Sequence, residues 1–199
     1  LGEKYLKKYK KIQENYLSED NVIFIYSEKH LGGKYSTPYF TSKVFELTEK
    51  LIIMDDDLIF NNDFLDYCDF CLDYFENDKN IYSIEGFNPF ANNDVESYIF
   101  LTNYTLQLGW ATWRNRWESY SNDLTNEGSI MILKNLFRNF KFDILSVIFW
   151  FIQIYKSEKH YVDAWDWYHF YNQFKRRTNS VIYSNNLVLH DGWGEESLN

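Results

Sequence analysis

Three runs of mainly apolar residues in the first half of the chain predict buried strands. They are "NVIFIY" (residues 21–26), "KLIIM" (50–54) and "NIYSIEG" (80–86). Strands covered on both faces read as continuous apolar runs, whereas strands with one face in water alternate between apolar and polar residues. The runs therefore predict a parallel sheet buried between layers of helices.

Segments with helical spacing of apolar residues separate these runs. Residues 3–17 predict an amphipathic helix, and a short helix is expected around residues 38–47. Asn62 can cap a helix over residues 63–76, whose apolar face toward the sheet would hold Phe64, Cys68, Cys71 and Phe75. Alternating helices and strands predict an α/β fold with three layers and a mostly parallel sheet.

The second half of the chain has a different pattern. From about residue 91 it is irregular, and from roughly residue 129 to residue 176 it is helical. A last strand is predicted at "SVIYSN" (180–185), before a glycine-bearing tail that contains Gly192 and Gly194. Because no Pro- or Ser-rich linker divides the chain, we expect residues 1–199 to form a single domain.

Charge and composition narrow the range of functions. The net charge of −9 argues against a general nucleic-acid surface. Cys68 and Cys71 have no second pair or nearby His, so they are expected to pack as small apolar residues in a reducing compartment. The run "FDILSVIFWFIQIY" (142–155) is too short to span a bilayer. It predicts a buried or groove-forming helix, with contact at a membrane surface as the alternative.

Three consecutive carboxylates, Asp55, Asp56 and Asp57, follow the predicted strand "KLIIM". Two carboxylates about 4 Å apart repel each other by roughly 4 kcal/mol at an effective dielectric constant near 20. Ligands of open α/β sheets bind at the carboxyl ends of strands, and Mg²⁺ or Mn²⁺ with phosphate oxygens would neutralise this cluster. The alternative is a solvated turn or cap of the next helix, from which Leu58, Ile59 and Phe60 separate the carboxylates.

Four stretches together resemble the GT-A glycosyltransferases, in particular the subgroup similar to N-acetylglucosaminyltransferase I and to bacterial polysaccharide-building transferases. "LIIMDDDLIFNNDFLDYC" (51–68) resembles the metal-binding DxD motif, and "LGWATWRNRW" (108–117) matches a G-W-A-T-W segment. "HLGG" (30–33) resembles a turn before the metal strand. "DAWDWYHFY" (163–171) and "NLVLHDGWGEE" (186–196) resemble the family's acidic helix and C-terminal loop.

The resemblance implies a GT-A fold, with residues 1–90 as the nucleotide- and metal-binding half and residues 91–199 as the acceptor-side half with a C-terminal lid. Residue 1 falls in the helix after the family's first strand, so that strand is expected to be missing from this sequence. Asp57 would bind Mn²⁺ or Mg²⁺ on the donor diphosphate, and Asp56 would contact the donor ribose or sugar. Asp55 takes a position usually held by Glu. Gly32 would belong to the donor site.

A second pair of carboxylates is a candidate for the acceptor side. If residues 163–174 form a helix, Asp163 and Asp166 share a face with Trp167, Phe170 and Phe174. An apolar wall raises the pKa of a carboxyl toward the range that suits a general base. The resemblance also implies a base in this segment, and we favour Asp166 over Asp163, which has the alternative role of helix N-cap.

Three further residue types are candidates with structural alternatives. Trp110 and Trp113, beside Gly109, could stack on an acceptor sugar or pack in the core. His190 could bind the metal or a phosphate, and its alternative is a structural role. Gly192 and Gly194 would allow the tail to close over the site.

The resulting hypothesis is a cytoplasmic, metal-dependent inverting glycosyltransferase of surface polysaccharide or glycolipid synthesis, with a nucleotide-sugar donor and a glycan or glycolipid acceptor. A peripheral contact with the inner face of the membrane is compatible with it. The alternatives are a catalytically silent glycan-binding module and a phosphatase of the haloacid-dehalogenase type. The latter expects a Ser or Thr soon after the aspartates, and "DDDLIFNN" has none.

Overall fold

The computed structural model describes residues 10–11, 14, 21–91, 97–124, 127–141, 143–159 and 161–190. The chain divides into two compact units, Leu1–Leu31 and Gly32–Asn199. All elements named below belong to the second unit. The predicted helix over residues 3–17 and the glycines of the tail lie largely or wholly outside the described residues. Residues 21–26, predicted as a strand, are described and form none.

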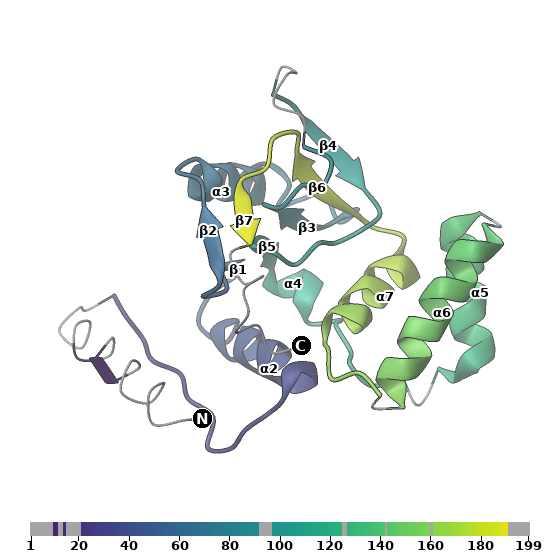
Figure 1. The fold of residues 1–199 in the computed structure, drawn as a ribbon. Coiled ribbons are helices and arrows are strands. Elements are labelled where there is room, and N and C mark those ends of the chain that lie inside the picture. The colour runs from purple at the N-terminus through teal and green to yellow at the C-terminus, as the bar shows by residue number, and fades with distance from the viewer. Residues whose placement is uncertain are drawn as a thin grey trace. The chain divides into compact units, whose positions relative to one another are not determined.

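The second unit contains helices on a mixed sheet (Figure 1). The helices are α2 (Gly33–Val44), α3 (Phe64–Tyr74), α4 (Arg114–Trp117), α5 (Gly128–Phe140), α6 (Ile144–Glu158) and α7 (Asp166–Arg176). The strands are β1 (Lys50–Ile53), β2 (Leu58–Phe60), β3 (Ile81–Glu85), β4 (Ile99–Thr102), β5 (Trp110–Trp113), β6 (Asn179–Tyr183) and β7 (Val188–His190).

The main sheet has the strand order β1-β5-β3-β6-β4, and β2 pairs with β7 in a separate two-stranded sheet. Among the described strands, only β3 and β6 pair in parallel, whereas β5 runs antiparallel to both β1 and β3, and β4 runs antiparallel to β6. The predicted α/β class is confirmed, but the described sheet is mostly antiparallel rather than mostly parallel. The reason is the insertion of β5 between β1 and β3, to both of which it runs antiparallel.

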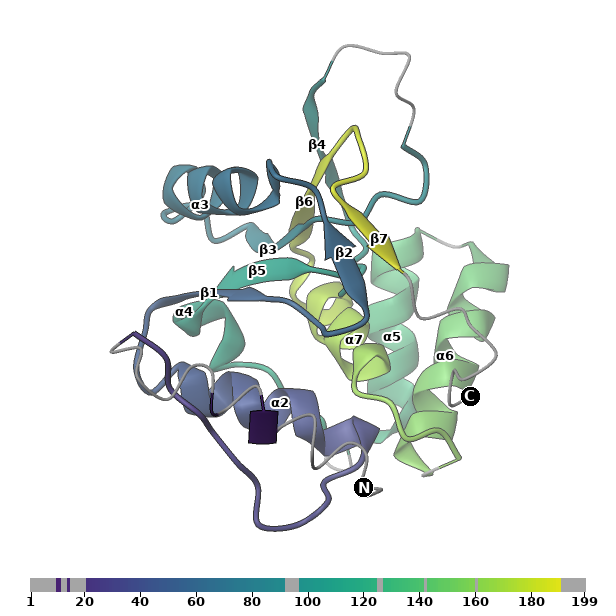
Figure 2. The same ribbon diagram turned by 60° about the vertical axis from the view of Figure 1, so that its left-hand side comes forward.

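Helices cover both faces of the main sheet (Figure 2). On one face α3 buries its stripe of Phe64, Tyr67, Cys68, Cys71 and Leu72, and the Trp113 ring nitrogen donates to the Leu72 carbonyl at 3.0 Å. The predicted helix and its sheet-facing side chains are thus confirmed, but its N-cap residue is Asp63 and not Asn62. Cys68 and Cys71 are free thiols in the core, as expected.

The opposite face of the sheet carries a cluster of aromatic rings. It consists of Phe45, Trp110 and Trp117, with Leu51, Ile53, Tyr120 and Trp165 packed against it. Because side chains alternate along a strand, β1 sends Ile52 to the α3 side and Leu51 and Ile53 to this side. The α4 and α7 helices lie along this face.

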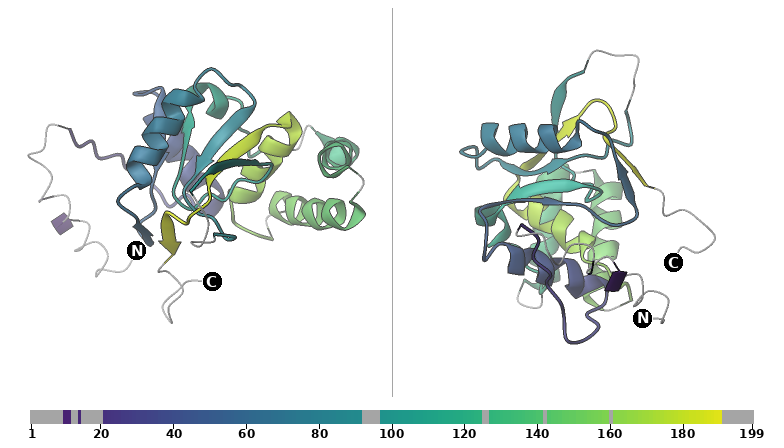
Figure 3. Two further views of the ribbon diagram at one scale, coloured as in Figure 1. Left: turned by 90° about the horizontal axis from the view of Figure 1, so that it is seen from above. Right: turned by 90° about the vertical axis from the view of Figure 1, so that its left-hand side faces the viewer.

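Helices α5, α6 and α7 form a separate apolar cluster beside the sheet (Figure 3). Its buried residues include Leu136 from α5, Trp150 and Ile154 from α6, and Tyr171 and Phe174 from α7. The helical character predicted for residues 129–176 is confirmed. The predicted strand "SVIYSN" corresponds to β6.

Candidate functional site

The three carboxylates lie in the turn between β1 and β2. Strand β1 ends at Ile53, and the Leu58 amide donates to the Asp55 carbonyl at 3.4 Å before β2 begins. The residues that separate Asp57 from α3 therefore form a strand of their own. This arrangement excludes the role of helix cap for the triplet, because Asp63 is the N-cap residue of α3. It agrees with the other alternative, a solvated turn, in that all three aspartates are exposed.

Pairing of β2 with β7 brings His190 to the triplet. Leu58 is the register partner of His190, and the His190 Nε2 atom lies 3.4 Å from the Asp57 Oδ2 atom. The Asp57 side chain is 52% exposed and that of His190 is 23% exposed, so both can reach a ligand from solvent. The two residues lie 133 positions apart in sequence, and the pairing of β2 with β7 brings them together.

The like charges of Asp55, Asp56 and Asp57 repel one another. The pKa of the Asp55 carboxyl is raised, mainly because surrounding protein atoms displace water and next because Asp57 and Asp56 carry like charges, whereas His190 lowers it. The side chain still reaches solvent, which weakens all of these interactions. The residual repulsion is the feature that a bound cation would remove.

These residues can bind a divalent cation if substrate phosphates and water complete its set of ligands. Within the described ranges, no three His, Cys, Asp or Glu side chains converge as a preformed metal cage. Mg²⁺ is usually held by one or two carboxylates together with substrate phosphates and water, and imidazole is a ligand that Mn²⁺ tolerates. Asp57 and His190 supply such a partial ligand set.

Two predicted site residues instead fix the N-terminus of α2. The Asp163 carboxylate accepts hydrogen bonds from the Gly33 amide at 2.9 Å and the Lys34 amide at 2.8 Å. Gly32 has φ of +75°, and a Cβ atom there would lie 2.6 Å from Asp163 Oδ2. Asp163 is therefore a helix cap, as its alternative role anticipated, but for α2 and not for the helix that follows it. Gly32 allows this approach.

Asp166 is the first residue of α7. Its Oδ1 atom accepts the Trp167 amide at 3.1 Å, and burial raises the pKa of its carboxyl despite the opposing effect of the backbone amides. Trp165, the preceding residue, stacks on Trp110 with ring centroids 5.7 Å apart. Trp110 in turn is the register partner of Ile53, two residues before Asp55. This chain of contacts links the start of α7 to the end of β1 that carries the triplet.

The tryptophans of β5 are core residues. Trp110 is fully buried in the aromatic cluster, and Trp113 is buried against α3 on the other face of the sheet. Trp113 also pairs with Lys50, at the end of β1 away from the carboxylates. Both tryptophans are therefore packed in the core and are not placed to stack on a sugar. Trp110 contacts the residue before Asp166 through its stacking on Trp165.

Gly109 also has a structural role. Its φ is +64°, and a Cβ atom there would lie 2.6 Å from Phe60 and 2.9 Å from Val188. The space beside Gly109 is filled by β2 and β7 and leaves no room for an acceptor sugar. The glycine thus lets the small sheet that carries Asp57 and His190 pack closely on the main sheet.

The sequence-based interpretation missed His169 on α7. Its ring is buried among aromatic rings, with centroids 4.7 Å from Trp110 and 5.1 Å from Trp165, and the Tyr82 hydroxyl is 3.4 Å from Nδ1. Burial, and next the Arg176 charge, lower the pKa of His169 to about 3. The signal that could have found it is helical spacing, because His169 follows Trp165 by one turn.

Comparison of the chain with family models and with curated proteins finds no match. The residues and their geometry, together with the sequence resemblance, are what indicate a function for this chain.

Proposed function

We propose that this protein is a metal-dependent inverting glycosyltransferase of the GT-A type. It would move a sugar from a nucleotide-sugar donor to a glycan or glycolipid acceptor in the cytoplasm, during surface polysaccharide or glycolipid synthesis. The observation that carries the proposal is the approach of His190 Nε2 to within 3.4 Å of Asp57 Oδ2, beside two further carboxylates at the end of a sheet strand. A mixed α/β sheet with helices on both faces is compatible with this function.

On the donor side, Asp57 and His190 would hold Mn²⁺ or Mg²⁺ together with the diphosphate of the donor. When bound, the cation supplies Lewis-acid stabilisation of the nucleoside diphosphate that leaves. Asp55 and Asp56 remain available to accept hydrogen bonds from donor hydroxyl groups. Like-charge repulsion in the triplet favours binding of a cation at this position.

On the acceptor side, Asp166 would act as the general base. The acceptor hydroxyl gives its proton to the Asp166 carboxylate while its oxygen forms a bond to the anomeric carbon of the donor. The bond from that carbon to the phosphate oxygen breaks, and its electron pair leaves with the nucleoside diphosphate. A pKa raised by burial makes Asp166 a better proton acceptor than an ordinary carboxylate. Asp163 suits the role less, because both of its oxygens already accept backbone amides.

The test is calorimetric titration of nucleoside diphosphates with and without Mn²⁺, for the full chain and two variants. Asp57→Asn should abolish Mn²⁺-dependent nucleotide binding and leave the thermal unfolding midpoint nearly unchanged. Asp63→Asn is the matched control, because Asp63 is also exposed and its side chain makes no cap hydrogen bond in α3. Unchanged binding by the Asp57 variant would overturn the metal assignment.

Two other results would redirect the proposal. Glycan binding without any metal-dependent nucleotide binding would indicate the silent glycan-binding module. Release of phosphate from simple phosphoesters, with no acceptor sugar present, would indicate a phosphatase.

A further inference from the structure

Helix α6 exposes a continuous apolar face. Its buried residues are Val147, Trp150, Ile154 and Ser157, which fall on one side at 100° per residue. The opposite side carries six large apolar side chains that are between 42% and 80% exposed: Ile144, Leu145, Ile148, Phe149, Ile152 and Tyr155. Single exposed apolar residues are ordinary, but a contiguous set on one helix face marks an interaction surface.

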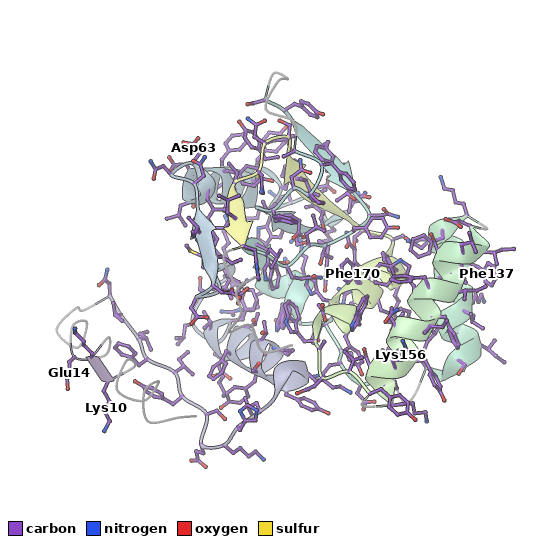
Figure 4. The ribbon with its side chains drawn as sticks, in the orientation of Figure 1. Lys10, Glu14, Asp63, Phe137, Lys156 and Phe170 are labelled. Carbon is purple, nitrogen blue, oxygen red and sulfur yellow. The ribbon has the colours of Figure 1, made fainter. Side chains whose placement is uncertain are left out.

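The neighbouring helix extends the apolar character of this region. On α5, Ile130 is 85% exposed, and Met131 and Phe137 are also exposed. Figure 4 shows Phe137 on the outer side of the helical cluster, whereas Phe170 lies where α7 faces α6. Both α5 and α6 thus combine a buried side in the shared core with an exposed side that contains large apolar residues.

The segment that contains α5 and α6 is basic, in contrast to the acidic chain as a whole. Residues 127–159 contain five basic residues, Lys134, Arg138, Lys141, Lys156 and Lys159, all of them exposed, and three acidic ones, Glu127, Asp143 and Glu158. The full sequence has 20 basic and 29 acidic residues. None of the five cations forms an ion pair with another described residue.

The acidic side chains of this region are engaged locally. Glu127 pairs with Lys175, and Asp143 accepts hydrogen bonds from the Ser146 amide and hydroxyl at the start of α6. Glu158 accepts a hydrogen bond from the Tyr168 hydroxyl. These hydrogen bonds leave the carboxylates charged, so five basic and three acidic residues give the region a net charge of +2.

We infer that the exposed face of α6 docks on a membrane surface that contains anionic phospholipid. A helix with apolar residues on one side and lysines at its flank lies in the headgroup region, where both the apolar area and the anionic charge favour binding. A second copy of the chain is a poorer occupant, because it would bring like cations together. No helix among the described residues is long and apolar enough to cross a membrane, so the contact is peripheral.

This inference goes beyond the proposed transfer reaction and does not require it. If both hold, docking through α6 would keep the enzyme beside lipid-linked acceptors. The two can fail separately, because Asp57→Asn should abolish nucleotide binding and leave membrane binding unchanged.

The experiment is flotation of the full chain with vesicles of phosphatidylcholine alone or with about 30 mol% phosphatidylglycerol, a mixture that imposes a negative surface potential. We expect binding to the anionic vesicles that weakens with salt. The double variant Ile148→Ser/Phe149→Ser should lower the partition coefficient at least about tenfold, because it removes two apolar anchors. Lys156→Ala should lower it about fivefold.

The control is Phe70→Ser/Tyr74→Ser on α3. These two rings stack on each other and are 57% and 70% exposed, so the change in exposed apolar area is similar but lies on another surface. The control should bind vesicles like the wild type, and circular dichroism should show that each variant is folded. Equal loss in both double variants, or no vesicle binding by the wild type, would overturn the inference. A second contradicting result would be a wild-type dimer, detected by light scattering, that the α6 double variant disrupts and the α3 double variant does not, while both variants still bind vesicles.

Discussion

The Asp163 carboxylate accepts a 2.9 Å hydrogen bond from the backbone amide of Gly33, a residue 130 positions earlier in the chain. The Lys34 amide donates to the same carboxylate, so two of the unpaired amides at the start of α2 are satisfied from a distant loop. A negative charge at a helix N-terminus also interacts favourably with the helix dipole. Asp163 therefore connects the segment before α7 to α2.

Replacing Asp163 should destabilise the protein. We expect Asp163→Ala to lower the free energy of unfolding by about 1–2 kcal/mol, the usual cost of losing a helix cap. Urea unfolding followed by circular dichroism measures this change. Asp63→Ala is the matched control, since Asp63 occupies the N-cap position of α3 without a side-chain cap hydrogen bond, and should change stability little. Equal losses in the two variants would contradict the capping role.

Gly109→Ala should lower the free energy of unfolding more than Gly128→Ala does. The new Cβ atom would meet Phe60 at 2.6 Å and Val188 at 2.9 Å, in addition to the strain of a positive φ. We expect a loss of about 2–4 kcal/mol, the sum of left-handed strain and overpacking. Gly128→Ala is the control, because Gly128 has φ of +63° with nothing within 4 Å of its Cβ position, and should lose only about 1 kcal/mol.

His169 should make stability fall in acid. Its folded-state pKa of about 3 lies below the ordinary value of 6.5, so the unfolded state binds the extra proton first. The contribution of neutral His169 to stability is complete above pH 6.5 and is lost as the pH falls toward 3. Over this range the free energy of unfolding falls by up to about 1.4 kcal/mol per pH unit. Burial raises the pKa of the neighbouring Tyr82 and Tyr120 hydroxyls, so both stay neutral in this range.

The comparison that isolates this effect is His169→Phe, which keeps a ring in the same aromatic surroundings. Urea unfolding at several pH values between 3 and 7 should give a smaller pH dependence for the variant than for the wild type. Parallel curves for the two proteins would show that the imidazole is not the group responsible.

Asp166→Asn tests the assignment of the general base. If the protein transfers sugars, this variant should lose about 10²–10⁴-fold in kcat, the usual contribution of a general base, while nucleotide binding in the presence of Mn²⁺ is retained. The pH profile supplies a second readout, because the acidic limb of the kcat profile should follow the raised pKa of Asp166. A variant with full activity and an unchanged profile would place the base elsewhere.

The two cysteines should be chemically silent in the folded protein. Both thiols are fully buried, and burial raises the pKa of Cys68 and raises that of Cys71 to about 12, so the reactive thiolate is rare at neutral pH. Iodoacetamide should label neither residue in buffer and both in urea, as measured by intact mass. Rapid labelling of the native protein would show that α3 opens or that the C-x-x-C pair is redox-active.

Local sequence patterns determined the elements that bury a recognisable apolar surface. The strands β1 and β3 and the helix α3 could be predicted because each has its own run or periodic stripe of apolar residues, which does not depend on distant partners. The helical stretch from α5 to α7 was predicted for the same reason. The aspartate triplet was found because three adjacent like charges are unfavourable whatever the fold.

Only the tertiary structure decided how these elements pair and which side chains meet. Strands β2, β4, β5 and β7 contain three or four residues each, and they exist through partners that are distant in sequence. The residues of "NVIFIY" have strand propensity but no strand partner in the described chain, and Ile23 and Tyr26 are exposed. Likewise Asp57 meets His190, and Asp163 meets Gly33, across more than 120 residues. Propensity is a short-range property, whereas hydrogen-bond pairing and capping depend on distances that only the folded chain sets.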